Sequence, residues 1–137
     1  MKNGKAQLSM EYMAVMGFVL LLTLPLTIIF FEQSTSARDQ VNAQKAGQII
    51  REITDTSEQV YYLGEPTAKT IKVSMPDNVK KISIINTEIA ITIETSSGDS
   101  DVIGVSAVNL TGNLSTASGI HQIKIQAIGN GVSISNT

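Results

Sequence analysis

Few side chains in this sequence could take part in catalysis. The 137 residues contain one histidine and no cysteine, which excludes disulfides, cysteine nucleophiles and cysteine-ligated metals. His121 alternates in step with Ile123 and Ile125, so it is expected at the rim of the apolar face of a strand. No nucleophile motif pairs with it, and the sequence has no glycine-rich phosphate loop and no HExxH. We therefore expect no enzyme activity, no cofactor and no metal.

The pattern with the most chemical meaning lies at the amino terminus. Its members are Lys5, Ala6, Gln7, Ser9 and Glu11. A run of 20 residues without a charge follows, from Tyr12 to Phe31, and a helix of that length crosses the hydrocarbon core of a bilayer. A carboxylate is costly in hydrocarbon, so Glu11 at the edge of this run indicates a functional partner.

This pattern resembles the class III signal peptide of archaeal type IV pilins. In those leaders a basic and a small residue precede the cut, and Gln-x-Ser-x-Glu follows it. The family often has Leu four residues after the Glu, where this chain has Val15. The resemblance implies that a membrane-embedded prepilin peptidase cuts between Ala6 and Gln7, which removes residues 1–6. It also implies that Gln7, Ser9 and Glu11 serve processing and assembly.

The apolar run is expected to be the first half of a long helix. Residues 7–36 form this apolar membrane or filament-core half, with a possible break at Ser34–Ser36. Pro25 is expected to kink it, because proline has no N–H to donate to the carbonyl of Leu21. The flanking Thr23 and Thr27 could satisfy the freed groups.

Residues 37–64 are expected to form an amphipathic second half of the helix. One apolar stripe consists of Val41, Ala46, Ile49, Ile50, Ile53, Val60 and Leu63. Gly64-Glu65-Pro66 predicts the end of the helix.

Residues 65–137 change to a period of two, which predicts six or seven short strands in an antiparallel sheet or small sandwich. The expected fold class is therefore α+β. Ser96–Ser100 is expected to be a loop, Val102–Asn109 a strand and Leu110–Ser118 a polar connection. The stripe of the helix is the expected cover for the apolar faces of the strands.

Two tripeptides in that connection match the acceptor pattern for N-glycosylation. They begin at Asn109 and Asn113. Both residues are predicted glycan sites if this domain is exported, and the alternative is a plain polar loop.

Together these features favour a pilin, a structural subunit of a surface pilus that serves adhesion. Its precursor would sit in the plasma membrane, and its partners would be identical subunits, the prepilin peptidase and the assembly machinery. The alternatives are a membrane-anchored domain that does not polymerise, a β-domain secreted after a cut behind Ala37, and an archaellin, a group that usually lacks Gln-x-Ser-x-Glu. The net charge is −2 and basic residues do not cluster, which argues against a nucleic-acid partner.

Replacing Ala6 with Leu should leave the precursor uncut in the membrane, because the proposed cleavage site requires a small residue beside Gln7. Mass spectrometry of the membrane-bound chain measures this. A mature chain of unchanged mass from the Ala6→Leu variant would contradict the proposed cleavage site.

Overall fold

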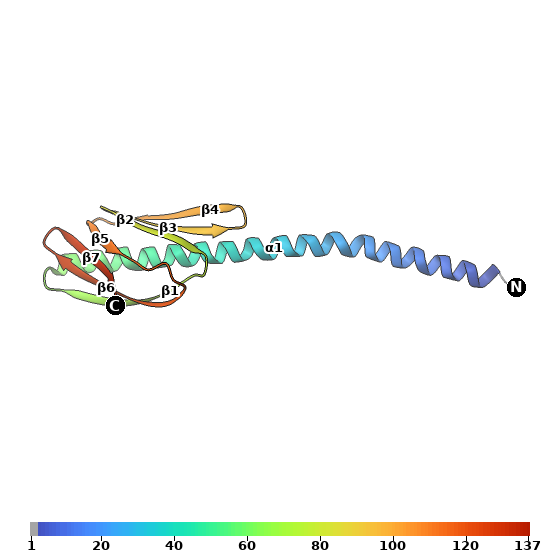
Figure 1. The fold of residues 1–137 in the computed structure, drawn as a ribbon, viewed down its shortest axis with the longest axis horizontal. Coiled ribbons are helices and arrows are strands. Elements are labelled where there is room, and N and C mark those ends of the chain that lie inside the picture. Colours follow the sequence, from blue (N-terminus) through green and yellow to red (C-terminus); the bar gives the residue numbers. More distant parts are fainter. Residues whose placement is uncertain (1–2) are drawn as a thin grey trace. The chain divides into compact units, whose positions relative to one another are not determined.

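A computed structural model describes residues 3–137, with side chains from Gln7 onward. The chain divides into two units, Met1–Ala37 and Arg38–Thr137. Figure 1 shows the elements of both units along the chain.

The first element is a single helix, α1, which spans Asn3–Leu63. It continues through Ser34–Ser36, so the possible break there is absent, and the Thr35 hydroxyl donates to the Phe31 carbonyl at 3.1 Å. The predicted end at Gly64 is confirmed. Gly64 has φ 79°, a left-handed conformation that glycine adopts without strain, and its N–H donates to the Tyr61 carbonyl at 3.0 Å.

Seven strands in two sheets follow the helix, which confirms the α+β fold. Their bounds are β1 Ala68–Met75, β2 Val79–Ile85, β3 Glu88–Thr95, β4 Gly98–Val105, β5 Leu110–Asn113, β6 Gly119–Ile128 and β7 Gly131–Asn136. One sheet has the order β1-β6-β7-β5 and the other β2-β3-β4. Neighbouring strands are antiparallel except for β5 and β7, which run parallel.

Two predictions are wrong at β5. The segment expected to be a polar connection contains this strand, and the strand pairs parallel to β7 although an antiparallel sheet was predicted. Only Leu110 in β5 is buried, while Thr111, Gly112 and Asn113 are exposed. Alternation therefore gives no strand signal here. The pairing depends instead on backbone contacts, such as the Val132 N–H that donates to the Asn109 carbonyl at 2.8 Å.

The region between β3 and β5 also differs from the prediction. Ser96–Ser100 was expected to be a loop, but β4 already begins at Gly98 and ends at Val105, short of Asn109. Lys80, across the sheet, donates to Asp99 at 2.6 Å and lies 3.6 Å from Glu94. The hydrogen bond to Asp99 raises the pKa of Lys80. The polar residues at the start of β4 were therefore interpreted as a loop, although they belong to a strand whose outward residues are charged.

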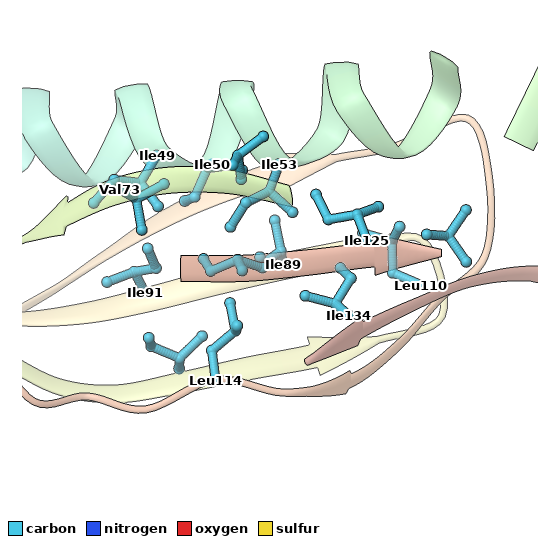
Figure 2. Close-up of a cluster of buried hydrophobic side chains, with 14 of the residues drawn as sticks. Ile49, Ile50, Ile53, Val73, Ile89, Ile91, Leu110, Leu114, Ile125 and Ile134 are labelled. Atoms are coloured by element: carbon cyan, nitrogen blue, oxygen red, sulfur yellow. The ribbon is translucent and has the colours of Figure 1, made fainter. Parts of the chain in front are cut away.

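The core lies where both sheets face α1. Ile49, Ile50 and Ile53 of the helix point towards strand residues that include Val73, Ile89 and Ile125 (Figure 2). The predicted stripe is correct in its centre and wrong at its ends. The correct members are Ala46, Ile49, Ile50, Ile53 and Val60, which are buried. Val41 and Leu63 are 48% and 74% exposed.

Polar residues complete the buried face of the helix. Thr54, Thr56 and Ser57 are buried beside Ile53 and Val60. The Thr54 hydroxyl donates to the Arg51 carbonyl at 3.0 Å, whereas the Ser57 hydroxyl has no hydrogen-bond partner among the described residues. An unpaired buried hydroxyl lowers stability.

One close contact fixes β4 against the helix. A Cβ atom at Gly104 would collide with Cγ2 of Ile50, so only glycine permits this approach. A Cβ atom at Gly47, on the helix, would meet Val102 Cγ1 at 3.8 Å, which is ordinary contact. Both glycines therefore lie where α1 and β4 meet. A methyl group fits at Gly47 but not at Gly104.

Residues 37–137 should fold in water without the preceding segment, because every buried apolar side chain of the core lies within them. Circular dichroism and a cooperative thermal melt test this. The matched variant Ile53→Asp should abolish the melt, since it places an unpaired charge at a fully buried position. A disordered unsubstituted fragment would contradict the expectation.

The two glycines provide a second prediction. Gly104→Ala should destabilise the fold by about 1–3 kcal/mol through overpacking against Ile50. Gly47→Ala should stabilise it by up to about 1 kcal/mol, because alanine is the better helix former. Urea unfolding of the two variants tests this prediction. Equal urea midpoints for Gly104→Ala and Gly47→Ala would mean that the Gly104 contact does not limit packing.

Candidate functional site

The candidate site is the apolar surface of α1 before Ala37. Seventeen large apolar or aromatic side chains between Leu8 and Phe31 are exposed, from 44% at Met16 to 74% at Met10. They lie on every side of the helix rather than on one stripe. A helix that is apolar all round requires an apolar environment such as a bilayer or the interior of an assembly.

The two threonine hydroxyls near Pro25 donate to carbonyls of the same helix. The hydroxyl of Thr23 donates to the carbonyl of Val19 at 2.7 Å, and that of Thr27 donates to the carbonyl of Thr23 at 2.9 Å. Neither hydroxyl reaches the carbonyl of Leu21, which Pro25 leaves without its usual donor. Within the chain, the two threonine hydroxyls therefore do not replace the missing donor, and α1 nevertheless continues through Pro25.

The motif residues lie at the start of this segment. Gln7, Ser9 and Glu11 are helical and exposed. Gln7 and Glu11, four residues apart, share one face of the helix, with about 6 Å of rise between them. Ser9 lies on another face. The side chain of Ala6 lies outside the described side chains, and Lys2 lies outside the described residues.

The helix that contains this segment is long and apolar enough to cross a membrane. By its length and composition, this amino-terminal helix could therefore anchor the chain in a membrane, as the sequence predicts.

Beyond Ala37, polar contacts hold α1 to the β-domain. The Asp39 carboxylate accepts hydrogen bonds from the Ser96 hydroxyl at 2.6 Å and from the Ser96 N–H at 2.9 Å. The hydroxyl contact and then the N–H contact lower the pKa of Asp39. Further along the helix, Glu58 accepts from the Ala107 N–H at 2.8 Å. Sequence reasoning missed both contacts, because a carboxylate on the polar face of a helix gives no signal of a distant backbone partner.

The remaining predicted residues are separate from this segment. His121 is partly buried, and its Nε2 lies 2.7 Å from the Ala117 carbonyl oxygen. Among residues 3–137, no group of three histidine or acidic side chains is close enough to hold a metal ion. Asn109 and Asn113 are both exposed, just before β5 and at its end. The Asn109 side-chain amide donates to the Asn130 carbonyl at 3.4 Å.

No family model, curated protein or solved structure matches this chain.

The contact of Asp39 with Ser96 makes a prediction about pH. Since the folded-state pKa of Asp39 is depressed, its stabilisation is complete above the ordinary value of 3.8 and is lost as the pH falls through the lower folded value. Asp39→Ala should therefore lower the melting temperature at neutral pH, and the difference from the parent should shrink below that range. Parallel melts in detergent measure it. A difference that is constant down to strongly acidic pH would contradict an ionic role.

Proposed function

We propose that this chain is the structural subunit of an archaeal type IV-like pilus at the cell surface, where the fibre serves adhesion. A prepilin peptidase would cut between Ala6 and Gln7, and the assembly machinery would then pack the apolar segments of many copies side by side. The observation that supports this most is the combination of the Gln7-x-Ser9-x-Glu11 motif with an all-round apolar helix that continues into a folded β-domain.

The exposed segment contains enough apolar surface to stabilise such a fibre. Burying one large apolar side chain contributes about 1.5–3 kcal/mol. Seventeen such side chains between Leu8 and Phe31 could therefore contribute tens of kcal/mol, even when buried only in part. Association costs roughly 4–15 kcal/mol in lost freedom of motion. The balance favours burial over exposure to water by a wide margin.

The precursor already buries this segment in the bilayer, and lipid tails are as apolar as leucine. Apolar burial alone therefore does not favour the fibre over the bilayer. The choice between bilayer and fibre must therefore be made by the charged groups and by packing. Lys2 and Lys5 favour a precursor whose end stays at the cytoplasmic face. Cleavage removes both lysines and leaves the single amine of Gln7, which makes the segment easier to extract.

Glu11 has a defined role in this scheme. Cleavage would make Gln7 the first residue of the mature chain, with Glu11 four residues further along the same helix. The new amine and the Glu11 carboxylate could then pair, within one copy or between neighbours. A charge that leaves water without a partner costs far more than a paired one. The competing role for Glu11 is recognition by the peptidase alone.

A second candidate is a membrane-anchored domain that does not polymerise. The length and composition of α1 are equally compatible with such an anchor. Neither the motif nor the all-round exposure of the segment favours such an anchor over a filament subunit. Assembly must therefore be tested directly.

Leu21→Lys should abolish filaments, because it places an isolated charge in the middle of the proposed fibre core. One lysine costs only about 2.5–3.5 kcal/mol on insertion scales, so the precursor should still reach the membrane. Electron microscopy of shed surface material measures assembly, and membrane fractionation confirms insertion.

Two controls make the result specific. Leu21→Met keeps the position apolar and should leave the fibres intact. Lys124→Ala changes an exposed residue of β6 and should also be harmless. Normal fibres built wholly from the Leu21→Lys chain would show that this segment does not line a fibre core, and the anchored domain would then be the better reading.

A further inference from the structure

A depression of about 570 Å³ lies where the edges of the two sheets meet. Its walls come from the end of β2, the start of β5 and the turn between β6 and β7. Two backbone hydrogen bonds hold these segments together. The Leu110 N–H donates to the Asn86 carbonyl at 2.6 Å, and the Val132 N–H donates to the Asn109 carbonyl at 2.8 Å. The depression is therefore built on the ordered framework of the β-domain.

The lining of the depression combines apolar and neutral polar side chains. None of its ten residues is charged. Two isoleucines supply exposed apolar surface, with Ile85 65% and Ile128 39% exposed. Three asparagines, Asn86, Asn109 and Asn130, supply amide groups that both donate and accept hydrogen bonds. An ionic ligand would find no opposite charge here.

A ligand that fits this lining must be neutral, must have many hydrogen-bonding groups and must also offer an apolar side. Carbohydrates have these properties, because a sugar ring has C–H faces and a rim of hydroxyl groups. A mainly apolar surface with a few placed polar groups is also the usual composition of binding sites. The exposed isoleucines then have a reason to be where polar residues would be expected.

Asn109 connects this chemistry to the sequence. It lines the depression, is exposed, and begins the acceptor tripeptide Asn109-Leu110-Thr111. Its amide has two N–H groups, and the hydrogen bond to the Asn130 carbonyl uses one of them. The other can be replaced by a sugar without loss of that contact. Asn113, the second acceptor, is not part of the lining.

We propose that this depression is a carbohydrate site and that the glycan predicted at Asn109 lies in it. Nδ2 would form a bond to the anomeric carbon of a lipid-linked oligosaccharide. The bond from that carbon to the phosphate oxygen would break, and the phosphate would leave with the electron pair. One amide proton would pass to a base of the transferase. This step rests on export of the β-domain, which is part of the proposed function.

The first experiment maps glycans on the chain recovered from its own cells. Fragmentation of the peptide between Lys81 and Lys124 separates the two acceptors. A glycan should be found on Asn109, should be lost in Asn109→Gln and should persist in Asn113→Gln. An unmodified Asn109 would overturn the attachment.

The second experiment asks whether the sugar occupies the depression. Hydrogen exchange of the glycosylated chain, before and after enzymatic removal of the glycan, should show severalfold slower exchange around Asn86 and Asn130 when the glycan is present. In Ile85→Glu, which removes part of the apolar surface, the glycan should remain while this protection is lost. A glycan on Asn109 without any protection would overturn the site.

A third arm separates the two possible sources of sugar. Unmodified chain from a host without N-glycosylation is exposed to free glucose, galactose, mannose and N-acetylglucosamine. Protection around Asn86 by a free sugar in this arm, together with an unmodified Asn109 in the chain from its own cells, would support the site and contradict the attachment. A glycosylated chain that forms no fibres would keep this inference and contradict only the filament.

Discussion

Burial of apolar surface is the interaction on which this molecule depends, and the chain completes it over only part of α1. Around Ile49, Ile50 and Ile53 the helix finds two sheets whose inward faces are almost wholly apolar. Between Gln7 and Ala37 its apolar side chains are exposed among the residues that the structure describes, although the composition is more apolar there. The first region explains the fold, and the second is the surface on which the proposed association with lipid or with other helices rests.

The period of the sequence predicted most of this arrangement. The change from a helical period to alternation at Pro66 marks the start of the β-domain, and Gly64 ends the helix as its left-handed φ requires. Strands with a full inward apolar set, such as β3 with Ile89, Ile91 and Ile93, gave clear signals. Apolar and polar residues alternate where one face of a strand is buried. This pattern therefore identifies those strands that bury one whole face.

The errors follow from the same rule. β5 buries only Leu110 and takes its place through backbone pairing with β7, which no local pattern records. Thr54 and Ser57 are buried, although polar residues are expected on the exposed face of a helix. Val41 and Leu63 are exposed, although they continue the apolar stripe. The close approach of Gly104 to Ile50 depends on two residues far apart in the chain. The depression beside Asn109 likewise exists only after three distant segments come together. By contrast, the motif at Gln7, Ser9 and Glu11 is a linear signal, so it can be read from the sequence, and folding adds only its helical placement.

The hydroxyls of Thr23 and Thr27, both turned towards their own backbone, have a mechanical consequence. They leave the outer surface of the segment almost without directional bonding groups. If such segments pack against one another, the contacts along their length would be held by dispersion and by the fit of their apolar side chains. The directional contacts that could set the axial register would then lie at the ends of the segment, where Glu11 and the polar residues from Glu32 onward are found.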